Sequence, residues 1–430
     1  MSGNCNRKAL KMFENVNSQG FKREYEKFVT HLERQLAEDY LVARAKYELI
    51  RSMYWLLPDG FALPPHTINV SVNNQCFFKC KMCDFGQGHH ETFFSRYNFV
   101  PSRKRKDRID MPLETGKQIV DQVKWFRPII RASFVEPLLY PDLTPFIEYT
   151  KANGLPFWLI TNGLLLSKMA ESLVAAGLDL IRVSLDGPPP IHDRIRGIKG
   201  SFSKAIEGVR LLVEEKKRHN KNRPLIGFNF TLSNHNYHSV YDFVKALDNA
   251  GVVSGSHIID IQWMQYTTAK VAELHNSKDA DESGALIEES SLHGVNIDEI
   301  DMNQVLKQYE MIKTEYIDKG KCQFRFRPSF EKRYLDMLHS SRSHEFFTKN
   351  PRCYILWYNL NLNSSGEAKT FHRCCLPSFG NLGDYEDVWT LWNNKTVREQ
   401  RMKLRKHGAY QGCSRCWGTF SEMKKSKESG

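Results

Sequence analysis

The chain has 430 residues, and its 61 basic and 49 acidic residues give a formal net charge of +12. Hydrophobic residues make up 41% and charged residues 26%, as in ordinary globular proteins. This composition excludes a mainly disordered chain, and no apolar run reaches the ~18–20 residues of a membrane span. The opening MSGNCNRKAL lacks the apolar core of a secretory signal, so we expect a cytoplasmic protein with no membrane partner.

Part of the excess positive charge lies in three short basic runs, at 103–106, 216–218 and 424–427. Such runs are typical of solvated faces or loops, and binding of nucleic acid is the sharper alternative. No zinc-finger His pair and no aromatic RNA-binding motif accompanies them. We therefore do not expect nucleic acid as a partner.

The first 60 residues predict a helical extension. Apolar residues at mixed three- and four-residue spacing between Phe21 and Leu56 indicate one or two amphipathic helices. Pro58, Gly60 and the Pro64–Pro65 pair end this pattern.

Strand-like runs then alternate with helical patterns. The strands are expected at 68–72, 130–134, 157–161, 180–185, 226–232 and 258–264, and the helices at 113–126, 143–153, 166–176, 202–218 and 237–250. This alternation predicts an α/β fold with a parallel sheet and right-handed crossovers, as a partial (β/α)6 TIM-like barrel or an open sheet. Functional groups are then expected at the C-terminal ends of the strands.

The pattern changes toward the C-terminus. Residues 267–302 are read as a polar connection, and a helix is predicted over 303–318. Residues 350–420 contain five cysteines and short strands, which predicts a small cysteine-held module. The predicted domains are a helical extension over 1–60, a barrel over 61–320 and a cysteine-rich domain over 321–430.

The ten cysteines are clustered, which favours metal or iron–sulfur ligation over disulfides. Cys76, Cys80 and Cys83 form C-x3-C-x2-C directly after the first predicted strand. Three thiolates on one loop suit a [4Fe-4S] cluster with one iron open to a small molecule. A structural zinc site is the alternative, with a fourth ligand from His89 or His90.

The strand ends carry further motifs in a telling order. They read Phe-Val-Glu-Pro at 134–137, Ile-Thr-Asn-Gly at 160–163, Val-Ser-Leu-Asp-Gly-Pro at 183–188, His-Asp at 192–193, Arg-Gly at 196–197, Gly-Ser-Phe at 200–202 and Thr-Leu-Ser at 231–233. With the three cysteines, this succession resembles the radical S-adenosylmethionine (radical SAM) superfamily over roughly residues 66–266. The family's Gly-Gly-Glu-Pro element has lost both glycines here. Residues 84–110 form an insertion, read as a lid, a substrate loop or a variable surface loop.

The resemblance implies that SAM chelates the open iron and contacts the strand ends. Met82 is implied to contact adenine, and Glu136 the amino group of the methionine part. Arg196 is implied to contact the carboxylate, and Ser184 the carboxylate or the ribose. Asn162 and Thr231 are implied to contact the ribose. All of these except Met82 also have a structural reading: a capping carboxylate for Glu136, a strand hydroxyl for Ser184, a surface ion pair for Arg196 and a structural side chain for Asn162 and Thr231.

The later cysteines resemble the twitch or SPASM extension of the same superfamily. Cys353, Cys374, Cys413 and Cys416 are implied to hold one auxiliary [4Fe-4S] cluster, with Cys375 competing with Cys374. A zinc ribbon is the alternative, because four thiolates also suit tetrahedral zinc.

The resemblance implies an enzyme that cleaves SAM reductively to a 5′-deoxyadenosyl radical, which abstracts a hydrogen atom from a substrate. The auxiliary cluster would accept an electron, and a flavodoxin or ferredoxin would supply one. We expect a small polar metabolite of the sugar or aminocyclitol kind as substrate. A peptide substrate, and a non-catalytic zinc or iron–sulfur interaction protein, are the alternatives.

Overall fold

The computed structural model describes residues 19–35, 39–87, 108–255, 257–290, 292, 294–327, 353–370, 374–414 and 416. Most of the insertion, with His89, His90 and the basic run at 103–106, lies outside the described residues, as do Cys5 and the run at 424–427. Within the described part, no helix is long and apolar enough to cross a membrane.

One curved sheet of ten strands forms the centre of the molecule, in the order β10-β9-β8-β1-β2-β3-β4-β5-β6-β7. The strands are β1 (Thr67–Val70), β2 (Ile129–Ala132), β3 (Phe157–Thr161), β4 (Leu180–Ser184), β5 (Leu225–Leu232), β6 (Ile258–Trp263), β7 (Gln323–Arg327), β8 (Asn359–Leu362), β9 (Glu367–Lys369) and β10 (Gly380–Asn381). Neighbours from β8 through β1 to β7 are parallel. The predicted α/β partial barrel is confirmed, and β7 adds a strand that was not predicted.

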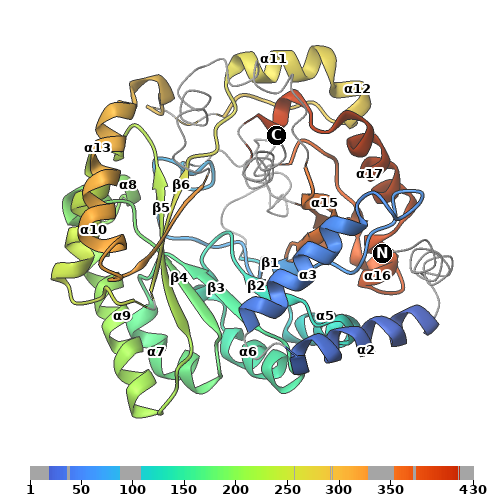
Figure 1. The fold of residues 1–430 in the computed structure, drawn as a ribbon, viewed down its shortest axis with the longest axis horizontal. Helices are drawn as coiled ribbons and strands as arrows, with labels where there is room; N and C mark the ends of the chain where they lie inside the picture. The colour runs from blue at the N-terminus through green and yellow to red at the C-terminus, as the bar shows by residue number, and fades with distance from the viewer. Residues whose placement is uncertain are drawn as a thin grey trace.

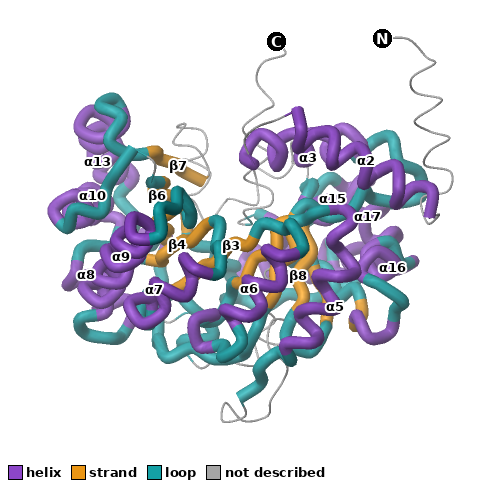
Figure 2. The backbone as a smooth tube through the Cα atoms, turned by 90° about the horizontal axis from the view of Figure 1, so that it is seen from below, coloured by secondary structure: helices purple, strands orange, loops and turns teal. Residues whose placement is uncertain are grey.

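Helices cover the outer side of the curved sheet, and two helices precede it in the chain (Figures 1 and 2). The helices of the extension and barrel are α2 (Gln19–Gln35), α3 (Asp39–Met53), α5 (Leu113–Val123), α6 (Leu143–Ala152), α7 (Leu166–Ala175), α8 (Pro189–Arg196), α9 (Ser201–Arg218), α10 (Val240–Asn249) and α13 (Met302–Ile312). Short helical turns are η1 (Lys124–Phe126), η2 (Pro137–Leu139), η3 (Tyr237–Ser239), η4 (Ile297–Glu299) and η5 (Lys313–Ile317). The predicted helices are thus confirmed within a few residues at each end.

Side-chain alternation along the strands separates an apolar outer face from a polar inner face. Ile68 and Val70 of β1 are fully buried in one core cluster with helix residues such as Phe146 and Val209. Asn69, between them, lies on the opposite face. Its amide nitrogen donates to Asn359 at 2.8 Å and Asn361 at 2.5 Å on β8.

The inner face also holds a buried ion pair. Arg182 on β4 donates to Asp260 on β6 at 2.8 Å and to Asn229 on β5 at 3.0 Å. A charge on this face needs such partners, because burial without them is costly. The interior of the partial barrel is therefore a polar, hydrogen-bonded surface that extends toward the ends of the strands.

The cysteine-rich region continues the barrel sheet. β8 pairs in parallel with β1, Asn69 opposite Asn361, and β9 and β10 follow as antiparallel strands. Helices α15 (Ile355–Tyr358), α16 (Val388–Trp392) and α17 (Lys395–His407) and the turns η7 (Leu382–Asp384) and η8 (Gln411–Cys413) complete it. The domain limits at residues 60 and 320 stay a prediction.

The segment read as a polar connection at 267–302 is more ordered than predicted. It forms α11 (Ala269–Lys278) and α12 (Ala280–Ser283), and α11 packs against η8 near Cys413 (top of Figure 1). Val271, Ala272 and His275 are the buried side chains of α11. This small buried set explains why the periodic signal was weak in the sequence.

Arg401 on α17 joins the C-terminal region to the entry of the barrel. Its fully buried guanidinium donates to the carbonyl oxygens of Gly60 at 3.1 Å, Leu356 at 2.9 Å and Trp392 at 2.9 Å, and to Asn393 at 2.9 Å. Its positive charge also lies 4.3 Å from the centre of the Trp392 ring.

The backbone at Gly60 also lies very close to the backbone of α17. Gly60 has φ +70°, and a Cβ there would lie 2.1 Å from the carbonyl oxygen of Arg398. Arg398 itself donates to the carbonyl of Asp59 at 2.9 Å. The segment before β1 is therefore held by side chains more than 300 residues away.

Replacement of this buried cation should strongly destabilise the fold. We expect Arg401→Met to lower the free energy of unfolding by about 3–5 kcal/mol, because the buried carbonyl acceptors lose their donors. Lys403→Met is the matched control, since Lys403 is exposed on the same helix, and should change it by about 0.5 kcal/mol or less. Urea unfolding measures both, and equal midpoints for the two variants would contradict the assignment.

Candidate functional site

The three-cysteine loop follows β1 at the edge of the sheet where all the parallel strands end. Cys80 is buried, and Cys76 and Cys83 are half-buried. The Gln87 side chain donates to the carbonyl of Cys80 at 3.0 Å, and a Cβ on Gly86 would lie 2.7 Å from the Cys80 nitrogen. The loop is thus closed tightly around Cys80.

The thiols of this loop influence one another electrostatically. Burial raises the pKa of Cys76 to about 12, and the charges of Cys80, Glu136 and Cys83 add to the rise. Burial likewise raises the pKa of Cys80 to about 12, although Arg196 opposes it. A thiol in this setting ionises readily only when a metal centre takes up the thiolate. The donor set therefore fits a cationic cluster.

The spacing of the sulfur atoms bears on which metal centre fits. Among the described residues, one set of three Cys, His, Asp or Glu ligand atoms lies within 4.8 Å of one another, and it contains no cysteine. Sulfurs around a single zinc ion lie roughly 3.8 Å apart, given Zn–S bonds of about 2.3 Å. The three sulfurs of this loop are thus not all within 4.8 Å of one another, which is wider than the spacing around one zinc ion.

Glu136 joins three elements at this edge. It is 2% exposed, and its carboxylate accepts from the Thr161 hydroxyl at 2.6 Å, the Asn162 nitrogen at 2.8 Å and the Leu138 nitrogen at 3.0 Å. Burial raises the pKa of this carboxyl although these hydrogen bonds oppose the rise. The capping role is present, and since a carboxylate has about four acceptor sites, one is left for a ligand.

Asn162 links Glu136 to the cysteines. Its side-chain nitrogen lies 4.0 Å from the sulfur of Cys76, and its side-chain oxygen accepts from the Leu164 nitrogen at 2.9 Å. Ser184, the last residue of β4, and Thr231, near the end of β5, lie on the inner face in register with Asn229 and Gln262. The predicted residues thus line one edge, and their contacts with SAM stay a prediction.

Met82 belongs to a separate apolar cluster at this edge. It packs, with Tyr266, against the buried side chains of Met264, Leu292 and Val295. Met264 directly follows β6, so this cluster stands between the cysteine loop and the sixth strand end. The ring face of a flat aromatic ligand such as adenine can pack on a surface of thioether and aliphatic groups.

Arg196 has partners that the sequence did not reveal. Its guanidinium forms a 2.5 Å ion pair with the fully buried Asp186 and lies 3.7 Å from the sulfur of Cys80. Its Nε is buried without a hydrogen-bond partner among the described residues. The surface ion pair considered for Arg196 is thus a buried one.

The two residues of the His-Asp motif are structural. His192 is fully buried, and its Nδ1 accepts from the backbone nitrogen of Asp186 at 3.1 Å. Asp193 accepts from the backbone nitrogens of Gly200 at 2.5 Å and Phe202 at 3.0 Å, which fixes the start of α9. The motif therefore shapes the turn that carries Arg196.

The second cysteine group forms around Cys353. Burial raises the pKa of its thiol well above the ordinary value, and the charges of Cys413, Cys416 and Cys374 add to the rise. The four predicted ligands are therefore neighbours. Cys375 joins them, with its sulfur 3.7 Å from that of Cys413. The choice between Cys374 and Cys375 stays open.

Two further residues near this group were missed in the sequence. Burial lowers the pKa of Lys369 to about 7, and the charges of Cys374, Glu367 and Cys375 oppose this. On the other side, the Gly412 nitrogen donates to His275 of α11 at 3.4 Å. Lys369 lies shortly before the Cys374–Cys375 pair in the sequence, so it could have been recognised as a neighbour of these cysteines. The contact of His275 depends on the fold and could not.

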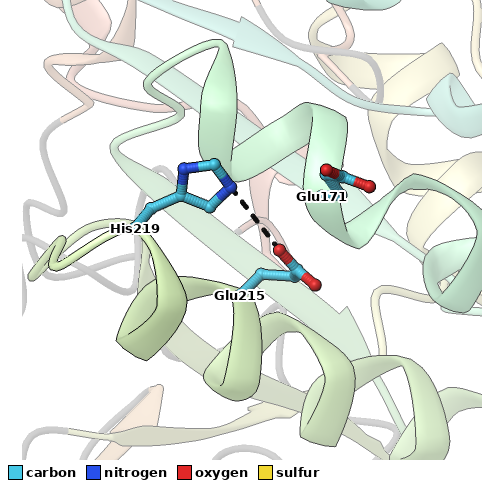
Figure 3. A group of neighbouring side chains, drawn as sticks. All are labelled: Glu171, Glu215 and His219. Atoms are coloured by element: carbon cyan, nitrogen blue, oxygen red, sulfur yellow. Dashed lines mark ion pairs between the residues drawn. The ribbon is translucent and has the colours of Figure 1, made fainter.

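A third cluster of ligand-type residues lies elsewhere. Glu171 on α7 and Glu215 and His219 at the end of α9 face one another (Figure 3). Arg218 forms ion pairs with Glu171 at 2.5 Å and Glu215 at 2.6 Å. Because α9 leads into β5, this cluster lies at the opposite end of the strands, and its carboxylates are already paired with Arg218.

Comparison with known proteins agrees with this geometry. The sequence model of the radical SAM superfamily matches residues 70–247. The chain is 32% identical over 194 residues to Fe-coproporphyrin III synthase of Methanosarcina barkeri, covering 42% of this chain and 43% of that protein. It is 35% identical over 159 residues to GTP 3′,8-cyclase of Helicobacter pylori, covering 36% and 45%. The chain thus spans less than half the length of these relatives.

Solved structures share the fold. Streptococcus suis SuiB bound to S-adenosylmethionine matches with TM-score 0.53 and 13% identity, over 90% of this chain and 81% of that chain. The structure of anSMEcpe with bound AdoMet and Cp18Cys peptide matches with TM-score 0.53 and 15% identity, over 80% and 84%. The likeness to SuiB extends beyond the barrel into the cysteine-rich region. Residues 70–247 of the chain thus carry a radical SAM domain.

The burial of His192 predicts a pH dependence of stability. Burial lowers the pKa of His192 to about 3, against ~6.5 in the unfolded chain. Because the unfolded chain binds the proton more readily, the free energy of unfolding is highest above pH ~6.5 and decreases as the pH falls. The decrease due to His192 is about 1 kcal/mol between pH 7 and 5.5. We expect His192→Asn, which keeps an acceptor for Asp186, to remove that loss in urea unfolding. His238→Gln, at an exposed histidine, is the control and should leave the loss unchanged.

Proposed function

We propose that this protein is a radical SAM enzyme with an auxiliary iron–sulfur cluster, acting in the cytoplasm. The observation that carries the proposal is the convergence of the three-cysteine loop with Glu136, Asn162 and Arg196 at one edge of a parallel sheet. When bound, the cluster and SAM supply one-electron chemistry: the sulfonium is cleaved to methionine and a 5′-deoxyadenosyl radical, which abstracts a hydrogen atom from the substrate.

Residues of the chain have separate parts in this proposal. Cys76, Cys80 and Cys83 hold the first cluster, and Glu136 accepts from the amino group of SAM through its remaining acceptor site. Met82 packs against adenine, as its apolar cluster favours. Ser184 and Thr231, on the inner face, bind the carboxylate or ribose.

The second cysteine group holds the auxiliary cluster in this proposal, through Cys353, Cys374, Cys413 and Cys416. Bound by these four thiolates, the cluster would have no iron open to chelate SAM, and it would supply a site that accepts an electron from the substrate. The net reaction is then an oxidation or a bond formation that releases one electron. A flavodoxin or ferredoxin supplies electrons to the first cluster.

The substrate is proposed to be a small polar metabolite. More specifically, the proposal is a sugar or an aminocyclitol. The names of the curated relatives support a small molecule, since they act on GTP or make Fe-coproporphyrin III. The polar inner face, with Arg182, Asn229 and Asp260, also suits a polar ligand. A peptide is the second candidate, because SuiB has been solved with its precursor peptide SuiA.

The first test is cleavage of SAM. We expect anaerobically reconstituted protein with a strong reductant to form 5′-deoxyadenosine even without substrate, measured by chromatography. Cys76, Cys80 and Cys83 replaced together by Ala should abolish it, because the first cluster loses its protein ligands. Cys322→Ala is the control, since Cys322 is buried like Cys80 but lies outside both groups. Cleavage by the triple variant would refute the assignment of the cluster.

The second test separates the two clusters. Cys413 and Cys416 replaced by Ala should remove about four of roughly eight irons and leave SAM cleavage in place, because the first cluster has its own ligands. Iron and labile sulfide are counted after solubility has been confirmed, since cluster loss can unfold the region it holds. A soluble double variant that keeps all its iron contradicts the ligand set. Zinc in place of iron in the wild-type protein supports the non-catalytic alternative.

A further inference from the structure

The environment of Arg196 points to a role beyond SAM binding. The Arg196 side chain is 12% exposed, and its guanidinium lies between the carboxylate of Asp186 at 2.5 Å and the sulfur of Cys80 at 3.7 Å. Arginine stays charged in proteins, and its fork places separate N–H donors on two acceptors at once. One side of this fork faces a carboxylate that is fully buried, and the other faces a cluster ligand.

Asp186 is itself held on several sides, so the position of Arg196 is fixed. Its second carboxylate oxygen accepts from the Thr231 nitrogen at 2.9 Å, and its backbone nitrogen donates to His192 at 3.1 Å. Its carbonyl accepts from the Asn236 side chain at 3.2 Å. These contacts come from β5, α8 and the loop after β5, which makes Asp186 a rigid anchor.

The end of α8 is also docked directly on the cysteine loop. The Lys81 nitrogen, next to Cys80, donates to the carbonyl of Ile195 at 2.9 Å. Gly197 has φ +77°, and a Cβ there would lie 3.3 Å from the carbonyl of Lys79. Helix α8 is therefore fixed to the loop, and Arg196 reaches Cys80 from the last helical turn.

We propose that Arg196 is a positioning residue of the first cluster, which donates to the Cys80 thiolate and raises the reduction potential of the cluster. The inference rests on the proposed function. Reduction adds one electron from an external low-potential donor and breaks no bond, so the reduced cluster carries one more negative charge. A fixed cation beside a ligand sulfur stabilises that form more than the oxidised form, and burial strengthens the effect.

The experiment measures the potential of the first cluster by EPR-monitored titration of the anaerobic holoprotein without SAM, with dithionite as reductant. Arg196→Gln should shift the potential to a more negative value while the iron content stays near wild type. Arg194→Gln is the matched control, because Arg194 is exposed on the same helix and should leave the potential unchanged. A wild-type potential in Arg196→Gln overturns the proposal. If that variant has a wild-type potential but a lower affinity for SAM, Arg196 is a SAM ligand only.

A second measurement covers the case in which Arg196→Gln does not assemble its cluster. Wild-type protein grown with 15N-arginine should show a weak 15N coupling to the reduced first cluster in pulsed EPR. The unlabelled lysine of Arg196→Lys should remove it, whereas Arg194→Gln should retain it. Absence of the coupling in wild-type protein overturns the proposal. The proposed function fails differently, by an absent cluster signal or by full iron in the triple cysteine variant.

Discussion

The carboxylate of Glu136 is the interaction on which the mouth of the barrel depends. It binds the ends of β3 through Thr161 and Asn162 and starts η2 through Leu138, and its own backbone nitrogen donates to Gln75 in the cysteine loop at 3.0 Å. The ends of three strands are thereby fixed by one buried residue. Since each hydrogen bond to a charged group contributes about 1.5–3 kcal/mol, the arrangement has little freedom to shift. The cysteine loop is therefore held in a fixed position relative to the strand ends.

The barrel could be predicted because its signals are local. Each strand is an apolar run of four to eight residues bounded by turns, and each helix has a periodic apolar face. The inner face could not be predicted in the same way, because Asn69, Arg182 and Asp260 find their partners on other strands. The pairing of β8 with β1 joins residues 290 positions apart, such as Asn69 and Asn359, and no local pattern encodes it. The helix α11 was missed because it is largely polar.

The site residues show the same division. Cysteine spacing and motif order identified the residues that gather at the strand ends, because motifs keep to the ends of consecutive strands in this fold. The motifs did not indicate which side chains pair with one another. Asp186 stood in the quoted Val-Ser-Leu-Asp-Gly-Pro run, yet its pairing with Arg196 depends on how α8 turns back over the loop. Cys374 and Cys375 are adjacent, so spacing cannot separate them, and the 3.7 Å contact of Cys375 with Cys413 shows that both reach the group.

Phe134 shows what the site retains when its sequence changes. It occupies the first glycine position of the family's Gly-Gly-Glu-Pro element, and its φ of 90° lies in the region that glycine favours. A bulky residue in that conformation costs about 1–3 kcal/mol and persists only where its surroundings fix it. Glu136, two residues later, supplies that fixation through three hydrogen bonds. The backbone before Glu136 thus has a conformation that glycine favours although Phe134 occupies the position, and the hydrogen bonds of Glu136 hold it there.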